Sequence, residues 1–253
     1  MPKYGMVIDL HKCAGCGACA VACKTENNTD DRVEGQRYNW ADFIVRTEGT
    51  FPDVKSETIP VLCNHCSKAA CVEACPVTPK AMFKTEDGIT MHNDERCIGC
   101  QACQEACPYS ATDVEDEGAP YSVISYIESE SDQYRRWKDA TELIENCTAS
   151  GAEIVRLTEQ MPPWRTLYKH PDYGSVRRPG IVEKCIFCEH RVKTGELPYC
   201  VVSCPSGARI YGDLEDKKST VSKLLKKHKY FRLKEEAGTE PNVYYIRSFS
   251  VRS

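Results

Sequence analysis

The grouping of its cysteines constrains this chain more than any other feature. Sixteen of the seventeen cysteines fall into four short groups within 253 residues. The first and third groups are spaced C-x2-C-x2-C-x3-C, and the middle gap is stretched to four residues in the second group and to eleven in the fourth. In chain order the groups are Cys13, Cys16, Cys19 and Cys23; Cys63, Cys66, Cys71 and Cys75; Cys97, Cys100, Cys103 and Cys107; and Cys185, Cys188, Cys200 and Cys204. Thiols repeated in this way predict a chain that folds around something they bind.

The regular spacing is that of bacterial ferredoxins, in which three cysteines surround one 4Fe-4S cluster and the fourth binds the neighbouring cluster. Gly15, Gly17 and Gly99 would let the backbone approach a cluster closely. A proline follows the fourth cysteine in three groups, as Pro76, Pro108 and Pro205. The first group has Lys24 there instead. The four groups therefore predict four 4Fe-4S clusters in two ferredoxin-like pairs.

Distance along the chain indicates which groups pair. Only the residues from Pro76 to Arg96 separate groups two and three, and this short connection is typical of one two-cluster unit. Groups one and four then pair around the outside. The predicted ligand sets are Cys13, Cys16, Cys19 and Cys204 (set one); Cys23, Cys185, Cys188 and Cys200 (set two); Cys63, Cys66, Cys71 and Cys107 (set three); and Cys75, Cys97, Cys100 and Cys103 (set four).

Two other uses of cysteine compete with clusters. Zinc sites hold two pairs of ligands apart, and only the fourth group resembles that arrangement. A disulphide scaffold suits short secreted chains, whereas cysteines three residues apart are poor partners for one another. Cys147 stands outside the groups and is expected to be a small buried hydrophobe rather than a ligand.

Several side chains near the groups could tune the clusters. A basic residue precedes the first cysteine in three groups, as Lys12, Arg96 and Lys184. A nearby cation raises the potential of an anionic cluster, and the alternative is a solvated side chain on a loop. His65 and His190 could donate hydrogen bonds but are not needed as ligands. Tyr109 and Tyr211 could shield a cluster from water or simply belong to the core.

The predicted fold class is α+β, with two duplicated bacterial-ferredoxin-like two-cluster units, a long insertion and a C-terminal helix. Short strands are expected at Lys3–Leu10, Gly88–His92 and Ala208–Tyr211. A short helix is expected after each fourth cysteine or within the second half of each cysteine loop. Ser219–Tyr230 places Val221, Leu224, Leu225 and His228 on one helical face, which predicts a surface helix packed on the cluster body.

These elements divide the chain into four parts. Residues 1–60 and 180–212 form the predicted outer ferredoxin-like unit, and residues 61–110 form the inner unit. Residues 111–179 are an insertion without expected ligands, and residues 213–253 are the C-terminal helix and tail. The insertion carries Trp137 and Trp164 and is expected to be an ordered contact surface for another subunit, with an elaborated loop as the alternative.

Composition argues against several functions. A net charge of −4 from 33 basic and 37 acidic residues, well mixed, gives no basic surface for nucleic acid. No run approaches the roughly 18 apolar residues that span a bilayer, and the N-terminus lacks the apolar core of a signal peptide. Because no catalytic triad, phosphate-binding loop or paired-carboxylate site is found, we expect electron transfer rather than catalysis by this chain alone.

The order of the groups, with the fourth split by eleven residues, resembles the iron–sulphur subunits of the dimethyl sulphoxide reductase family of molybdenum enzymes. The resemblance covers nearly the whole chain apart from the insertion. Several runs are similar to the small subunits of respiratory arsenate reductases and their arsenite-oxidising relatives: MVIDLHKCAGCGACAVACKTENNT, EGTFPDVK, IPVLCNHC, RRWKD and EAGTEPNVYYIRSF.

The resemblance implies a heterodimer with a large subunit that binds molybdenum through two pterin guanine dinucleotides and holds one further cluster. It implies that set one faces this catalytic partner and that set four faces a quinol-oxidising membrane protein or a cytochrome. Some relatives lose a cysteine and carry a 3Fe-4S cluster, whereas all sixteen cysteines are present here. Catalytic partners in this family commonly carry a twin-arginine signal, which implies a periplasmic location, with the cytoplasm as the alternative.

Other functions also fit the cysteine pattern. The chain could serve a polysulphide, thiosulphate, tetrathionate or other respiratory oxidoreductase. Relay subunits of formate dehydrogenases and hydrogenases often add a transmembrane helix or a signal, and neither is expected here. A free polyferredoxin would have a uniformly polar surface, and a zinc-binding module would be colourless when purified.

Overall fold

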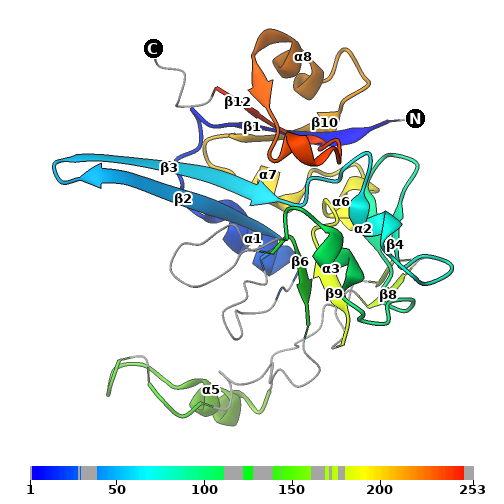
Figure 1. Ribbon diagram of the computed structural model, residues 1–253. Coiled ribbons are helices and arrows are strands. Elements are labelled where there is room, and N and C mark those ends of the chain that lie inside the picture. The colour runs from blue at the N-terminus through cyan, green and yellow to red at the C-terminus, as the bar shows by residue number, and fades with distance from the viewer. Residues whose placement is uncertain are drawn as a thin grey trace.

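A computed structural model describes residues 2–27, 29, 39–110, 122–127, 139–142, 144–160, 169–170, 173–175 and 180–247. One side of the molecule is a four-stranded sheet in the order β10-β1-β12-β11 (Figure 1). Its strands are β1 (Tyr4–Asp9), β10 (Arg209–Asp213), β11 (Tyr230–Phe231) and β12 (Val243–Ile246). β1 pairs antiparallel with β10 and parallel with β12, so both ends of the chain meet in this sheet.

Strand β1 is buried on both faces, which explains its nearly continuous apolar run. Met6 and Ile8 face the main core, whereas Val7 packs with Val221 beneath α8 (Thr220–Lys227). Ser219 caps this helix by accepting a hydrogen bond from the Ser222 backbone N–H at 3.2 Å. The predicted surface helix is therefore confirmed, and it covers the outer face of the sheet.

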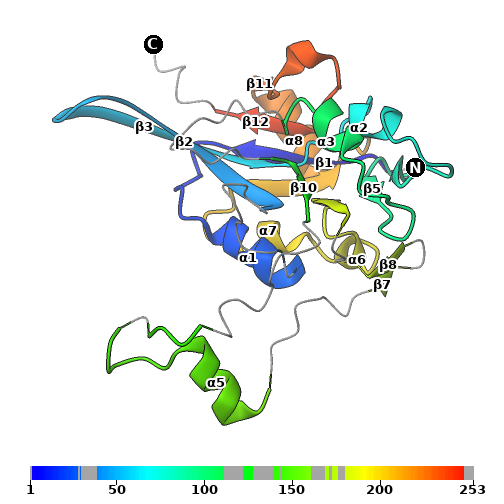
Figure 2. The ribbon, with the colours of Figure 1, turned by 60° about the horizontal axis from the view of Figure 1, so that its bottom comes forward.

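The cysteine groups lie on loops that lead into short helices. These helices are α1 (Ala18–Asn27), α2 (Ala70–Glu73), α3 (Ala102–Ala106), α6 (Glu189–Val192) and α7 (Tyr199–Val202). α1 packs against α7, and α2 packs against α3. Groups one and four are thus joined by one helix pair and groups two and three by another. Figure 2 shows α1, α7 and α6 on the opposite side of β1 from α8.

A long antiparallel hairpin separates the first two cysteine groups. β2 (Ala41–Thr50) and β3 (Asp53–Leu62) pair over ten positions, from Ala41 opposite Leu62 to Thr50 opposite Asp53. Only the end nearest the cysteines is buried, and the other end extends away from the body (Figure 1). Neither this hairpin nor the C-terminal strand β12 was among the elements predicted from the sequence.

Smaller elements complete the described chain. They are β4 (Met82–Lys84), β5 (Thr90–His92), β6 (Ile124–Tyr126), α5 (Gly151–Thr158), β7 (Lys169–His170), β8 (Tyr173–Ser175), β9 (Val182–Lys184) and the 3-10 helix η1 (Glu235–Ala237). β4 pairs with β5, β6 with β9, and β7 with β8. The three strands predicted next to cysteine groups are confirmed as β1, β5 and β10, and their ends agree with the predicted ends to within two residues.

The overall mixture of helices and small sheets confirms the α+β prediction. Helices α2, α3 and α7 lie within the second half of their cysteine loops, the second of the two predicted placements. Helix α1 runs on past Cys23 to Asn27, and α6 directly follows Cys188. Trp137 and Trp164 of the insertion lie outside the described residues. Within the described ranges, no helix combines the length and apolar character needed to cross a bilayer.

Candidate iron–sulphur cluster sites

Set one surrounds a cavity at the base of the hairpin. Cys13, Cys16, Cys19 and Cys204 line this cavity, which is partly open to solvent. The first two cysteines lie on the loop after β1, Cys19 lies in α1, and Cys204 follows α7. Phe43 and Thr58 of the hairpin line the same cavity. The fold therefore brings the last cysteine of group four to the first three of group one.

Set two is the most enclosed. Cys23, Cys185, Cys188 and Cys200 are each 7% exposed or less. Burial raises the pKa of Cys23, and the nearby thiols of Cys185, Cys200 and Cys188 raise it further. The four sulphurs thus lie within electrostatic reach of one another. Asn27 contacts two of these sulphurs, because its side-chain amide donates to Cys23 Sγ at 3.4 Å and to Cys188 Sγ at 3.9 Å.

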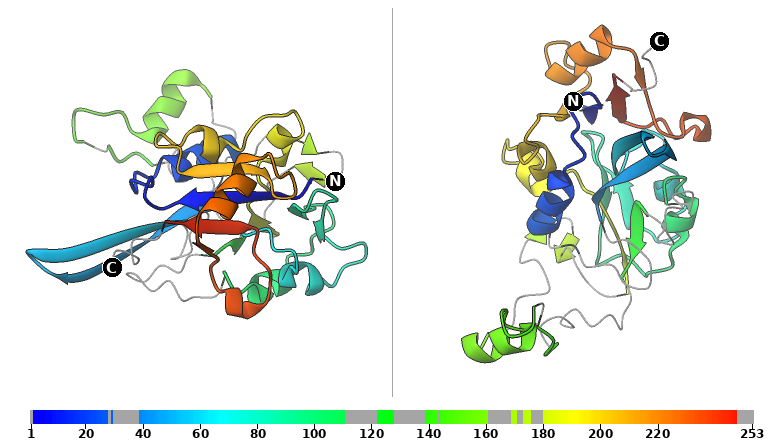
Figure 3. Two further views of the ribbon diagram at one scale, coloured as in Figure 1. Left: turned by 90° about the horizontal axis from the view of Figure 1, so that it is seen from above. Right: turned by 90° about the vertical axis from the view of Figure 1, so that its left-hand side faces the viewer.

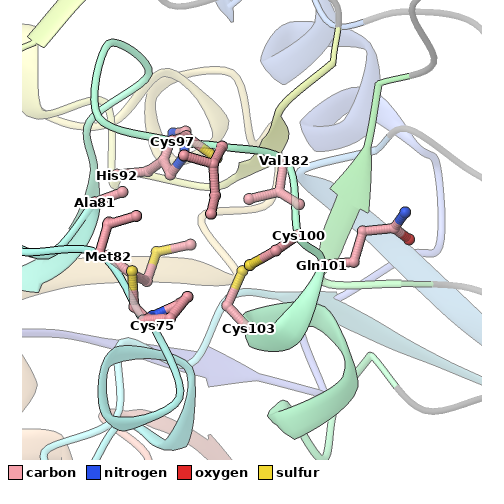
Figure 4. Close-up of a pocket in the computed structure, with 12 residues that line it drawn as sticks. Cys75, Ala81, Met82, His92, Cys97, Cys100, Gln101, Cys103 and Val182 are labelled. Atoms are coloured by element: carbon pink, nitrogen blue, oxygen red, sulfur yellow. The ribbon is translucent and has the colours of Figure 1, made fainter.

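Sets three and four surround two further cavities. Cys63, Cys66, Cys71 and Cys107 line one of them. Cys75, Cys97, Cys100 and Cys103 line the other. Figure 4 shows the latter four around the cavity, with Cys97 on the side opposite Cys75 and Cys103. In both sets, three cysteines of one group are joined by the last cysteine of the other.

A backbone constraint explains one of these loops. Gly99 lies between Cys97 and Cys100 with a φ of +69°, in the left-handed region that favours glycine. A Cβ atom there would lie 2.2 Å from the Gly180 carbonyl oxygen, so any side chain would push the two backbones apart. The loop can therefore press against the chain before β9 only because residue 99 is glycine.

The donor groups around the sulphurs fit anionic thiolates. The N–H of Gly99 donates to Cys97 Sγ at 3.5 Å, that of Phe187 to Cys185 Sγ at 3.4 Å, and that of Ala208 to Cys204 Sγ at 3.2 Å. The first two bonds join the first cysteine of a C-x2-C segment to the amide two residues later. Backbone amides are thus arranged to stabilise negative charge on sulphur.

The pKa values show why positive iron suits these sites. Burial raises the pKa of Cys66 to about 11, and it raises the pKa values of Cys103 and Cys188 to about 12, with neighbouring thiols adding to each rise. A thiol with such a pKa stays protonated at neutral pH. A bound cation removes this penalty, since iron ligation requires the thiolate and releases its proton.

Arg209 is a second indication that the sites suit an anionic group. Its side chain is 2% exposed, and its Nε and Nη2 atoms have no hydrogen-bond partner among the described residues. Burial alone would lower its pKa, but the thiolates of Cys200 and Cys19 raise it. A buried cation therefore lies between set one and set two. Its N–H groups could donate hydrogen bonds to the sulphurs of a cluster.

Lys184 has the matching position between sets two and three. It is 1% exposed, and its Nζ donates to the Cys185 carbonyl oxygen at 2.6 Å and to that of Thr90. Its charge counteracts the rise that burial and neighbouring thiols impose on the pKa values of Cys71 and Cys185. Lys12 and Arg96 are exposed instead. The alternative of a solvated loop side chain therefore holds for these two residues but not for Lys184.

The histidines and tyrosines have different surroundings. His65 is fully buried, accepts the Thr90 N–H through Nδ1 at 3.1 Å, and stacks on Phe187 with ring centroids 3.6 Å apart. His190 lies in α6 with its Nε2 2.7 Å from Glu26 Oε1, as a partly buried pair. Tyr109 lines the set-three cavity, whereas Tyr211 packs edge-on to Phe187 in the core.

The predicted burial of Cys147 is wrong. Its side chain is exposed in a turn where the Cys147 backbone N–H donates to the Ile144 carbonyl oxygen at 3.0 Å. A lone cysteine carries no periodic signal, so the sequence offered only the usual preference of this residue for the interior. Sequence reasoning also missed Asn27 and Arg209, which lie outside the cysteine runs and whose roles depend on tertiary contacts.

Comparison with known proteins agrees with this architecture. A family model described as a 4Fe-4S dicluster domain matches residues 54–125 and 138–214, and one described as a 4Fe-4S binding domain matches residues 10–26. The chain is 46% identical to the arsenate respiratory reductase iron-sulfur subunit ArrB of Shewanella sp. (strain ANA-3), over 99% of both chains.

Two other relatives are more distant. A selenate reductase subunit from Mesobacillus selenatarsenatis is 35% identical over 96% of this chain and 72% of the relative. A tetrathionate reductase subunit from Salmonella typhimurium is 32% identical over the same shares. With its four cysteine sets and these matches along nearly its whole length, the chain belongs to the iron–sulphur subunits of the dimethyl sulphoxide reductase family of molybdenum enzymes.

Proposed function

We propose that this chain relays electrons through four 4Fe-4S clusters between a molybdopterin catalytic subunit and a quinone-linked membrane protein or a cytochrome. The observation that carries this proposal is the unbroken series of cysteine sets. Sets one and two both draw ligands from α1 and flank Arg209. Cys185 of set two lies within electrostatic reach of Cys63 of set three, and sets three and four meet at α2 and α3.

The sixteen cysteines are assigned as iron ligands in the four sets. A cluster held by each set would supply one-electron redox chemistry. The protein's own part is to bury the thiolates, to donate N–H groups to their sulphurs and to place cations between neighbouring sets. The helix pairs α1/α7 and α2/α3 support the division into an outer unit (1–60 and 180–212) and an inner unit (61–110).

The two ends of the series are proposed to serve different partners. Set one is assigned to the catalytic subunit and set four to the quinone-linked protein or cytochrome. Cys16 in set one and Cys100 in set four are both exposed, so each end reaches the surface. The loops that carry them lie on different sides of the body (Figure 1). Export together with a signal-bearing partner would place the complex in the periplasm.

Arsenate, or arsenite in the reverse direction, is the proposed substrate of the catalytic partner. The support is the 46% identity over the full length to a subunit named for arsenate respiration, against 35% and 32% for the selenate and tetrathionate relatives. This chain does not touch substrate in the proposal. Its contribution is the electron path.

The decisive experiment is anaerobic purification of the intact complex from its native source, with measurement of iron, zinc and molybdenum per copy of this chain. We expect about sixteen irons from this chain, those of a partner cluster, and about one molybdenum. Abundant iron without molybdenum or tungsten would replace the proposal with a polyferredoxin or another complex. Stoichiometric zinc would overturn the cluster assignment itself.

The substrate is tested on the same preparation. Reduced methyl viologen should be oxidised on addition of arsenate and not on addition of selenate or tetrathionate. Preference for either of the other oxyanions would keep the relay assignment and reject arsenate.

A further inference from the structure

The β2–β3 hairpin loses contact with the body along its length. In β3, Asp53 to Ser56 are exposed, the next three residues are partly buried, and Pro60 to Leu62 are buried. β2 changes in the same way, from buried Ala41 to exposed residues at its far end. Figure 1 and the left-hand view of Figure 3 show the hairpin extending to the left, away from the body.

Both faces of the outer hairpin are uncovered. Successive side chains of a strand point to opposite faces, so four consecutive exposed residues in β3 leave neither face packed. The tip carries apolar side chains into solvent, with Phe51 92% exposed and Val54 50% exposed, and Val45 farther down the hairpin is 38% exposed. A two-stranded hairpin is marginally stable in water without a covering surface.

Local contacts give the tip a defined shape nonetheless. Lys55 Nζ lies 2.8 Å from Glu57 Oε1, and the hydroxyl groups of Thr47 and Ser56 are 3.4 Å apart across the strands. Gly49 has a φ of +92°, and a Cβ atom there would lie 2.1 Å from the Asp53 carbonyl oxygen. The hairpin therefore presents a shaped apolar tip.

The base of the hairpin is continuous with the first cluster site. Phe43, Thr58 and Pro60 line the set-one cavity together with its four cysteines. The Tyr245 hydroxyl donates to the Pro60 carbonyl oxygen at 2.9 Å, which ties β3 to the central sheet. A partner that lies over exposed Cys16 would therefore also meet the inner part of the hairpin.

We propose that the β2–β3 hairpin is a docking arm that lies against the catalytic subunit and holds its redox centre over set one. This inference rests on the proposed function, because it takes the catalytic subunit as the partner of set one. The tip residues Phe51 and Val54 insert into an apolar surface of that subunit, and the open strand edges are free to pair with its backbone.

Two variants test the arm in the full complex. Phe51→Ser with Val54→Ser removes the apolar tip but leaves the strands in place. In the second variant, Asn-Gly replaces residues 47–56, so that a two-residue turn joins the paired Arg46 and Glu57 and the strand register is kept. Phe43, Thr58 and Pro60 remain in both. The matched control is Leu197→Ser, since Leu197 is 47% exposed on the loop between α6 and α7, outside both the hairpin and the 111–179 insertion.

The readouts are the dissociation constant of the complex between this chain and the catalytic subunit, iron per chain and the cluster spectra of the variant chain. We expect both hairpin variants to weaken the complex by about tenfold or more, as for interface anchors, with iron content and spectra unchanged and with Leu197→Ser binding like the wild type. Unchanged binding of the hairpin variants, or equal loss in the control, would overturn the proposal.

Two further outcomes separate this inference from the function on which it rests. If the wild-type chain dimerises alone and the shortened variant becomes monomeric, the arm binds a second copy and the proposal is wrong. If the wild-type chain forms no complex with a molybdenum-containing subunit, the proposed function fails, whatever the hairpin variants do.

Discussion

Three buried side chains that carry N–H donors lie beside the enclosed cysteines. Asn27 donates two hydrogen bonds to sulphur within set two, Arg209 lies between sets one and two, and Lys184 lies between sets two and three. Each stabilises additional negative charge on a neighbouring cluster. Because a reduced cluster carries one more electron than an oxidised one, each of these residues favours the reduced form. Because all three are buried, water screens them little. They are the residues whose replacement should shift cluster potentials.

Replacing Asn27 by leucine removes the donor but keeps a similar volume. Loss of about 1 kcal/mol of preferential bonding to the reduced form should lower the set-two potential by roughly 40 mV. A redox titration followed by electron paramagnetic resonance measures this shift. Signals assigned to sets three and four serve as the internal control, and an equal shift in all signals would contradict a local effect.

Lys184→Met should lower the potentials of both set two and set three. A buried unit charge several ångströms away, at an effective dielectric constant of about 20, contributes roughly 2 kcal/mol, or on the order of 100 mV for one electron. The same titration measures both potentials, and a melting curve monitors folding, since the Thr90 and Cys185 carbonyl oxygens lose their donor.

Lys12→Met is the matched control, because Lys12 also directly precedes a cysteine group but is exposed. Solvent screening should keep its effect below about 20 mV. Comparable shifts from Lys12→Met and Lys184→Met would show that burial does not govern the tuning.

At the scale of elements, each site is a loop followed by a short helix, and the loop depends on close backbone approach. Gly99 is the clearest case, since its backbone is left-handed and lies against Gly180. The loop carries Cys97 and Cys100, and α3 carries Cys103. Displacing the loop therefore moves ligands of set four more than those of any other set.

Gly99→Ala should consequently lose the set-four cluster, about four of the sixteen irons, with the other clusters kept. Iron analysis and cluster spectroscopy of the purified chain measure the loss. Gly195→Ala is the control, because Gly195 has a φ of +83° but nothing within 4 Å of an added Cβ. Gly195→Ala introduces the same backbone strain as Gly99→Ala but no steric collision. We therefore expect the control to keep all its iron and Gly99→Ala to lose the iron of set four.

At the scale of the whole molecule, the four sets would form the proposed electron path, with an exposed cysteine at each end. The two ferredoxin-like units meet where Cys185, Lys184, Cys63 and His65 come together, so the path passes through the core rather than over the surface. A break at one end should therefore interrupt exchange with one partner and leave exchange with the other.

Cys100→Ser tests this at the set-four end. Arsenate reduction by quinol should fall to near background, whereas reduction by a viologen dye that delivers electrons directly to the catalytic subunit should persist. Cys16→Ser at the set-one end should also abolish the quinol-dependent rate, but with the set-four cluster still reducible by quinol. If Cys100→Ser left the quinol-dependent rate intact, set four would not be the quinol end.

The sequence by itself determined the kind of cofactor, the number of clusters and the family, because cluster ligation depends on local cysteine spacing. It also predicted α8 and the strands beside the cysteine groups from short-range periodicity. Chain distance alone placed Cys204 with the first group, and the fold brings those four cysteines around one cavity.

Only the tertiary structure decided which charges and which elements surround the sites. Lys12, Arg96 and Lys184 occupy the same position in their groups, yet only Lys184 is buried, because pairing of β9 with β6 encloses it. The place of β12 between β1 and β11, and the uncovered hairpin, likewise depend on segments distant in the chain. Burial and strand pairing are sums over such distant contacts, so local spacing and periodicity do not specify them.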